Sequence, residues 1–229
     1  MTDAAPRVSV TVVIPVLNEE ANLPLVLREL PDFIDEVIVV DGLSRDRSVE
    51  TALRVRPDCR VMLETRKGKG VAVTAGLAGA RGEYVLYLDG DYSHDPWETT
   101  RMVECLAQGY DVVHGSRFLP GGGSADLTTF RFLGNRIVVW LTNLLHGTRY
   151  TDVCYGYFGF RREAVRRLAV RAENMEIDAA LMIGAHKAGL RVIELPSFER
   201  RRFAGRSTLH PLRDGWKIIR EILRTRFRE

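Results

Sequence analysis

The sequence lacks the features that mark membrane-spanning, zinc-binding and disulfide-rich proteins. Its longest apolar stretch, residues 137–145, is far shorter than the roughly 20 residues that a helix needs to cross a bilayer. The three cysteines stand at unrelated spacings, and the five histidines include no helical H-x-x-x-H pair, so no metal knuckle or redox pair is expected. No charged leader followed by an apolar run opens the chain. We therefore expect reduced thiols and a cytoplasmic protein.

Two common nucleotide-binding signatures are missing as well. Residues 15–20, P-V-L-N-E-E, follow the first predicted strand, where a dinucleotide-binding protein would place G-x-G-x-x-G. No G-x-x-x-x-G-K-[ST] segment occurs, which excludes a P-loop nucleotide hydrolase. The composition, 45% hydrophobic and 28% charged, is that of a globular protein, and 229 residues suit a single domain over residues 1–229.

Positive charge is concentrated at the end of the chain. Residues 199–229 hold ten Arg or Lys and four Asp or Glu, whereas the whole chain carries a net charge of only +3. A basic tail suits an anionic partner such as a diphosphate, a lipid headgroup or nucleic acid, and a solvated helix face is the alternative. Because the chain has no recognised nucleic-acid-binding motif, we expect no nucleic-acid partner.

β-branched runs alternate with helical patterns through the first half of the chain. Strands are predicted at 8–14, 36–40, 60–63, 83–88 and 111–114, and helices at 18–30, after Ser44 or Asp46, at 70–81 and at 96–108. The alternation predicts an α/β fold with a mainly parallel sheet flanked by helices, a Rossmann-like three-layer sandwich. Ligands of such sheets bind at the carboxyl ends of the strands, where Pro15, Asp41 and Asp89 are expected to converge.

The second half of the chain is less regular. Residues 117–127 form a glycine-rich segment that we expect to order over a bound ligand. Helices are predicted at 130–145, 161–171 and 176–188 and from Pro211 onward, with a strand at 191–195.

The strongest chemical signal is the D-G-D turn formed by Asp89, Gly90 and Asp91. Two carboxylates on a turn that leaves a buried strand are costly unless a positive group holds them. Carboxylate oxygens suit Mg²⁺ or Mn²⁺, which would bridge to a substrate diphosphate. The alternative is a polar turn that only ends a strand, but its position at the predicted crevice favours the metal site.

Five motifs, in order, extend this interpretation. They are V-V-I-P-V-L-N-E-E, V-V-D-G-L-S-R-D, K-G-K-G, D-G-D-Y-S-H-D-P and G-S-R-F. With them the chain resembles the family 2 inverting glycosyltransferases over residues 8–209, and in particular the dolichyl- and polyprenyl-phosphate mannose and glucose synthases. The resemblance implies the GT-A fold, a metal-dependent hexosyltransferase, and a donor such as GDP-mannose or a UDP-sugar.

The resemblance also implies roles for single residues. The positions that match nucleoside-binding positions are Pro15, Leu17, Glu19 and Asp41. The implied metal ligands are Asp89, Asp91 and Ser93, with Gly90 between the carboxylates. The positions that face donor or acceptor phosphates are Lys69, Arg117, Arg131 and Arg202, and charge-assisted contacts suit that task. The family's lysine before the last helix is missing, and we expect Arg206 and Ser207 to serve the acceptor phosphate in its place.

The chemistry of the acceptor decides whether a general base is needed. A polyprenyl phosphate, the acceptor that the resemblance favours, is largely ionised at neutral pH because its second pKa lies near 6. A soluble hydroxyl acceptor, the alternative, would need a base, for which Asp152 is the first candidate and Glu176 or Asp178 the next. Structural capping is the other interpretation of all three. We expect three residues to act directly in catalysis, namely Asp91, Arg117 and Asp152.

The last predicted helix is amphipathic. Its apolar stripe consists of Leu212, Trp216, Ile219, Leu223 and Phe227, and the neighbouring basic stripe of Arg213, Lys217, Arg220 and Arg224. Such a helix suits the surface of an anionic membrane at its cytoplasmic face, and residues 130–145 form a second candidate contact. A helix packed on the sheet is the alternative.

Two rival functions remain for the chain as a whole. One is a sugar nucleotidyltransferase, and the other is a non-catalytic nucleotide-binding module, which would bind the donor without metal and without turnover.

Overall fold

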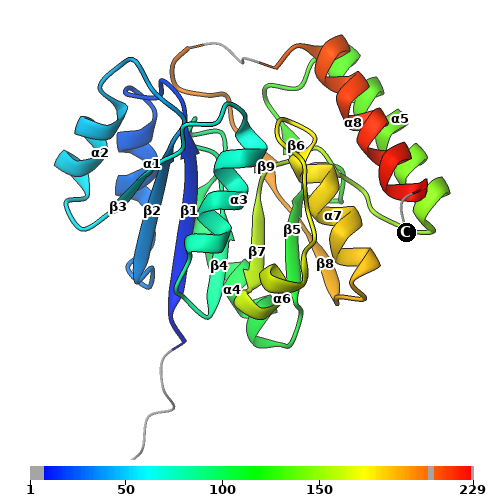
Figure 1. The fold of residues 1–229 in the computed structure, drawn as a ribbon, viewed down its shortest axis with the longest axis horizontal. Coiled ribbons are helices and arrows are strands. Elements are labelled where there is room, and N and C mark those ends of the chain that lie inside the picture. The colour runs from blue at the N-terminus through cyan, green and yellow to red at the C-terminus, as the bar shows by residue number, and fades with distance from the viewer. Residues whose placement is uncertain (1–7, 206–208, 228–229) are drawn as a thin grey trace, which may run out of the picture.

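A central β-sheet organises the protein, whose computed structural model describes residues 8–205 and 209–227. Within these residues the sheet has seven strands in the order β3-β2-β1-β4-β7-β5-β8 (Figure 1). They are β1 (Val10–Val16), β2 (Glu36–Asp41), β3 (Arg60–Leu63), β4 (Tyr84–Tyr87), β5 (Val112–Ser116), β7 (Phe158–Arg161) and β8 (Val192–Pro196). β7 runs antiparallel to both neighbours and the other pairs are parallel, so the predicted mainly parallel sheet is confirmed.

Helices cover both faces of the sheet. They are α1 (Leu23–Glu29), α2 (Ser48–Val55), α3 (Lys69–Gly79), the 3₁₀ helix η1 (Pro96–Glu98), α4 (Thr99–Ala107), α5 (Thr129–His146), α6 (Arg162–Arg167), α7 (Ile177–Lys187) and α8 (Pro211–Phe227). Successive side chains of a strand point to opposite faces. Val12 and Ile14 of β1 therefore join the core under α1, α2 and α4, and Val13 joins the core under α3 and α7. Helices α5 and α8 lie side by side at one end of the sheet (Figure 1).

The first strand is longer than predicted. Pro15, expected to end it, lies inside β1 in register with Val40, and the strand continues to Val16. The proline is tolerated because β4 pairs with β1 only as far as Val13, which leaves one side of β1 without a strand partner at Pro15. As a result the ends of β1 and β2 lie level, with Val16 beside Asp41.

The turn after β1 also differs from its prediction, because α1 begins at Leu23 and not near Asn18. Asn18 has a φ of 58°, in the left-handed region, so it does not start a helix. Its side chain accepts a hydrogen bond from the Arg45 backbone N–H at 2.7 Å, and its own N–H donates to Ser44 Oγ at 2.9 Å. Ser44 therefore braces this turn instead of capping α2. The loops after β1 and β2 hold one another in place.

The second half contains pairings that the sequence patterns did not predict. β7 was missed, and the helix predicted at 161–171 is the shorter α6. Part of the glycine-rich segment forms β6 (Gly123–Ser124), which pairs with β9 (Phe198–Glu199). No described helix is long and apolar enough to cross a bilayer. The assignment of residues 1–229 to one domain stays a prediction.

Candidate active site

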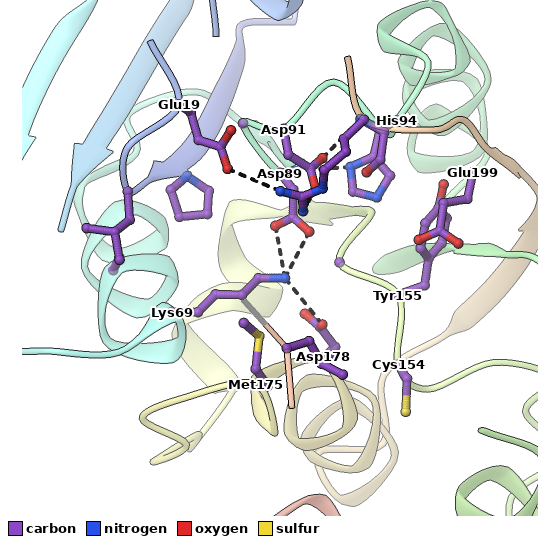
Figure 2. A pocket seen from close by; sticks show the side chains of 18 of the residues that line it. Glu19, Lys69, Asp89, Asp91, His94, Cys154, Tyr155, Met175, Asp178 and Glu199 are labelled. Carbon is purple, nitrogen blue, oxygen red and sulfur yellow. Dashed lines mark hydrogen bonds and ion pairs between the residues drawn. The ribbon is translucent and has the colours of Figure 1, made fainter. Parts of the chain in front are cut away.

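A cavity of about 250 Å³ opens beyond the carboxyl ends of β1, β2 and β4, where three loops were predicted to converge (Figure 2). Predicted site residues supply much of its wall. Those that line it are Pro15, Leu17, Glu19, Lys69, Asp89, Gly90, Asp91, Ser93, Arg117, Arg131 and Arg202. The structure thus brings residues that are up to 187 positions apart into one site.

Of the predicted residues that the structure describes, three do not line the cavity: Asp41, Asp152 and Glu176. Asp41 is buried and accepts hydrogen bonds from the Ser44 backbone N–H at 3.2 and 3.3 Å, so it caps the turn while its neighbour Gly42 lines the cavity. Asp152 lies behind Arg117 and is fully buried. Arg206 and Ser207 lie outside the described residues.

Lys69 joins two carboxylates at the floor of the cavity (Figure 2). Its Nζ lies 2.9 Å from both oxygens of Asp89 and 3.6 Å from Asp178 Oδ2. Burial lowers the pKa of Lys69, but Asp178 and Asp89 outweigh it and raise the pKa above its ordinary value. The Tyr87 hydroxyl donates toward both carboxylates, at 3.3 Å to Asp89 and 3.2 Å to Asp178. Lys69 and Tyr87 therefore hold the Asp89 carboxylate in one orientation.

Glycines on either side of Lys69 allow this placement. Gly68 has a φ of 131°, and a Cβ there would lie 2.1 Å from the Glu173 carbonyl oxygen. A Cβ at Gly70 would lie 2.4 Å from the carbonyl oxygen of Ala172. The K-G-K-G motif is thus needed for close backbone packing against residues 172–173, which aims Lys69 inward.

At Gly156 there is no room for a side chain, because the residue packs directly against the Lys69 cluster. A Cβ there would meet the Tyr87 hydroxyl at 2.6 Å, Lys69 Nζ at 2.9 Å and Asp89 Oδ2 at 3.1 Å. We expect Gly156→Ala to lower kcat/KM for the donor by about tenfold or more, since overpacking costs about 1–3 kcal/mol and each 1.4 kcal/mol is about tenfold in rate. The check is steady-state kinetics beside Gly184→Ala in α7, whose Cβ would meet only side-chain ends, at 3.2 and 3.5 Å. Equal kinetics for the two variants would contradict the constraint.

Asp91 faces the cavity from the other side of the D-G-D turn. Its Oδ2 accepts from Arg202 Nη2 at 2.7 Å, and its Oδ1 accepts from the Ser93 backbone N–H at 3.0 Å. Burial raises the pKa of Asp91, but the hydrogen bonds from Ser93 and the positive charge of Arg202 lower it below its ordinary value. The carboxylate is therefore ionised and available to a cation. Arg202 also approaches Glu19, at 3.9 Å.

The residues present fit a hard divalent ion that is shared with a substrate. Both D-G-D carboxylates face the cavity, and each is already paired with a side-chain cation. Among the described residues no group of three His, Cys, Asp or Glu side chains is arranged to hold an ion alone. Mg²⁺ commonly takes one or two carboxylates and completes its shell with water and substrate phosphates. The donor set suits that pattern and not a closed, all-protein site.

Arg117 and Asp152 form a buried, two-pronged ion pair. Arg117 Nε lies 2.8 Å from Asp152 Oδ2 and Nη2 lies 3.1 Å from Oδ1, while Nη1 reaches Glu199 at 3.3 Å. The guanidinium also stacks over the Tyr155 ring at 4.8 Å. Asp152 is 0% exposed and Arg117 4% exposed. Both oxygens of Asp152 are thus engaged away from the cavity, which does not favour the predicted role as a base.

The other two base candidates differ in position. Glu176 accepts from the backbone N–H groups of Glu173 and Asn174 at 3.2 and 3.1 Å, so its side chain stabilises the turn before α7. Asp178 lines the cavity, and burial raises its pKa although Lys69 opposes the shift. Of the three carboxylates, Asp178 alone combines exposure to the cavity with a raised pKa, as a general base for a hydroxyl would require.

Several wall residues were missed from the sequence. They include His94, Cys154, Tyr155, Gly156, Met175, Glu199, Leu209 and Ile218. His94 stands inside the D-G-D-Y-S-H-D-P motif, and that motif was the available signal. The others come from separate loops and helices that only the fold brings together.

A second, apolar cavity of about 270 Å³ adjoins the first between α5 and α8. The two share Arg117, Arg131, Cys154, Leu209 and Ile218. We call the second cavity the α5–α8 groove; the rest of its lining includes Phe130, Ile137, Leu212, Trp216 and Ile219. Its apolar walls are solvent-accessible, with Leu212 70% and Trp216 66% exposed. Arg131 stands at the junction of a charged cavity and an apolar groove.

The chain is similar to several known glycosyltransferases. Glycosyltransferase AglJ of Haloferax volcanii is 31% identical over 94% of this chain and 71% of its own length. The undecaprenyl-phosphate mannosyltransferase of Micrococcus luteus is 31% identical over 82% of each chain. Glucosyl-3-phosphoglycerate synthase of Mycobacterium tuberculosis, solved with Mn²⁺, UDP-glucose and phosphoglyceric acid, superposes with a TM-score of 0.75 at 23% identity, covering 96% of this chain and 80% of that one.

The last comparison shows the fold, which is the GT-A fold that the sequence predicted. The family model of glycosyl transferase family 2 matches residues 11–169, the segment that carries β1 to β7 and both carboxylates of the D-G-D turn. The chain belongs to glycosyl transferase family 2.

Proposed function

We propose that the protein transfers a hexose, of the mannose or glucose type, from a nucleotide-diphosphate sugar to a polyprenyl phosphate, with inversion at the sugar. The observation that carries the proposal is the direct junction of the carboxylate-bearing cavity with the α5–α8 groove at Arg131. The name of the Micrococcus luteus relative supports the same acceptor. The donor is a GDP-mannose or UDP-sugar type compound.

The donor side follows from the cavity wall. Pro15, Leu17 and Glu19 lie at the end of β1, where the nucleoside would bind, and Asp41 would act through the turn that it caps. Asp89 and Asp91, with Ser93 beside them, would hold Mg²⁺ or Mn²⁺. The ion, when bound, neutralises charge on the leaving diphosphate. Lys69 and Arg202, which pair with the two carboxylates, would bind the phosphate oxygens of the donor.

The acceptor side lies around Arg131. Its Nη1 is 3.2 Å from Asp126, and the two side chains are 21% and 37% exposed, so the pair is easily exchanged for a contact with phosphate. Arg202, which lines the same cavity, can contribute, and we assign Arg206 and Ser207 to the same phosphate. An ionised phosphate needs no base, so a single attack on the face opposite the diphosphate completes the transfer. Asp178 would serve as base only for the alternative, a soluble hydroxyl acceptor.

The groove and the exposed helix faces suit a lipid acceptor at a membrane. Beyond the groove, the outer faces of α5 and α8 expose Leu133, Trp140, Leu144 and Phe227, each between 57% and 78% exposed. Exposed Arg136 and Arg220 flank them. Apolar side chains beside arginines are typical of helices that lie on anionic lipid. We place the enzyme peripherally at the cytoplasmic face of a membrane, and its free thiols agree with that compartment.

Replacing Trp216 tests the groove. We expect Trp216→Ala to raise the KM for a prenyl phosphate in anionic vesicles by about ten- to a hundredfold, since burying a large apolar side chain is worth roughly 1.5–3 kcal/mol. Trp97→Ala is the matched control, because Trp97 is 61% exposed on η1 and outside the groove. Kinetics with varied vesicle concentration measure both. A KM that stays at the wild-type value in Trp216→Ala would contradict a role for the groove in acceptor binding.

A donor panel tests the proposal as a whole. The protein is incubated with Mn²⁺, a short-chain prenyl phosphate and each of several GDP- and UDP-sugars, and released nucleoside diphosphate and sugar-lipid are measured. We expect one class of donor to give both products in equal amounts. Binding of a donor with no turnover under any condition would favour the rival nucleotide-binding module.

A further inference from the structure

His94 is a buried histidine of the site, and the proposed function assigns it no role. It is 1% exposed, lines the donor cavity, and follows the D-G-D turn by three residues. Its Nδ1 lies 3.1 Å from the backbone nitrogen of Asp89, whose N–H can only donate. The ring nitrogen must therefore accept, which fixes the neutral tautomer with its proton on Nε2.

Two tyrosines hold the ring in that orientation. Tyr157 stacks on it at 4.7 Å between ring centroids, and Tyr155 meets it edge-on at 4.6 Å. Tyr157 is itself anchored, because its hydroxyl donates to the carbonyl oxygen of Asp95 at 2.6 Å, and the hydroxyl of Tyr155 bonds to Ser197 at 3.2 Å. The ring cannot turn without breaking these contacts. Residues 155–157 therefore fix one face of the D-G-D turn.

The Asp89 N–H is the group through which His94 restrains the backbone of the turn. Lys69 and Tyr87 fix the side chain of Asp89, and the Ser93 N–H and Arg202 fix that of Asp91. The His94 contact is the corresponding restraint on the backbone between β4 and the turn. Without an acceptor at this place, a partly buried donor would be left unsatisfied and the backbone would rotate to find another partner.

We propose that His94 is a positioning residue that sets the relative placement of the Asp89 and Asp91 carboxylates through the Asp89 N–H, and so determines divalent-ion affinity. The inference rests on the proposed metal role of those carboxylates. The effect of His94 on ion affinity depends on the acceptor atom Nδ1 and not on the bulk of the ring.

Two substitutions separate the acceptor from the ring. His94→Phe keeps an aromatic ring between the tyrosines but has no acceptor, whereas His94→Asn loses the ring and keeps an oxygen near the position of Nδ1. Mn²⁺ affinity is measured by electron paramagnetic resonance titration, with Mn²⁺ alone and with Mn²⁺ plus UDP, and thermal melting is followed in parallel. We expect Mn²⁺ affinity to fall about tenfold or more in His94→Phe, as loss of an orienting partner of a metal ligand commonly costs 10–100-fold. We expect His94→Asn to stay within about threefold of wild type, since its oxygen preserves the acceptor.

The outcomes are distinguishable. Wild-type Mn²⁺ affinity in His94→Phe, or equal losses in both variants, would overturn the positioning role while leaving the metal assignment intact. No Mn²⁺ binding by the wild-type protein, with or without UDP, would overturn the metal assignment and this inference with it. If His94→Phe does not fold, His94→Leu, which is smaller and equally unable to accept, carries the same expectation.

Discussion

Asp91→Asn is expected to lower donor turnover by about a thousandfold, because a bound metal ion supplies several kcal/mol of charge stabilisation and about 4 kcal/mol corresponds to that factor. Asparagine has nearly the size of aspartate and can still accept from the Ser93 N–H, but it removes the charge that faces the cavity. The fold should survive, since Arg202, the partner that loses its ion pair, can remain near Glu19.

Steady-state release of nucleoside diphosphate, with and without EDTA, is the measurement for Asp91→Asn. Asp95→Asn is the matched control, because Asp95 stands four residues on, pairs with Arg200 at 2.7 Å, and does not line the cavity. We expect near-normal turnover in the control. Full activity of Asp91→Asn, or of the wild-type protein in EDTA, would contradict the metal assignment.

Arg117→Met is expected to lower the free energy of unfolding by about 3–5 kcal/mol and to abolish activity. Breaking a buried pair from one side leaves an uncompensated charge, and Arg117 neutralises both Asp152 and Glu199. This is a larger effect than the loss of one phosphate contact, roughly 1.5–3 kcal/mol, that a purely substrate-binding arginine would cause. Equilibrium denaturation measures it.

The double variant Arg117→Met with Asp152→Asn separates the two roles of the arginine. Because it leaves no buried charge at Asp152, we expect it to recover much of the stability that the single variant loses. If activity returns with stability, Arg117 acts by holding the loops; if stability returns alone, Arg117 also contacts a phosphate. A single variant that loses less than about 1 kcal/mol would contradict the buried-pair interpretation.

The donor half of the site could be predicted from the sequence because it depends on local patterns. β-branched runs mark β1, β2 and β4, and in a parallel sheet their carboxyl ends must meet at one edge. Residues at those ends, such as Pro15 and Asp89, were therefore expected at one crevice, and they line one cavity. The resemblance to the family implied the place of Lys69, although the backbone packing that aims its side chain into the cavity is visible only in the structure.

The acceptor half could not be predicted in the same way, because it depends on contacts between distant segments. β7 is a short strand containing Gly159, inserted antiparallel between β4 and β5, and no periodicity marks it. Asp152 was expected as a base, because nothing local shows that Arg117, 35 residues earlier, occupies both of its oxygens. The parallel packing of α5 against α8, which creates the groove, joins helices about 80 residues apart.

The central claim is that the acceptor is a prenyl phosphate, and one comparison tests it directly. Labelled sugar is supplied on the donor that the panel identifies, with Mn²⁺, to a short-chain prenyl phosphate, to the same prenol without its phosphate, and to a set of soluble alcohols and sugars. The account predicts a sugar-lipid with inverted anomeric configuration from the prenyl phosphate, and no product from the prenol. Transfer to a soluble hydroxyl compound, with none to the prenyl phosphate, would contradict it.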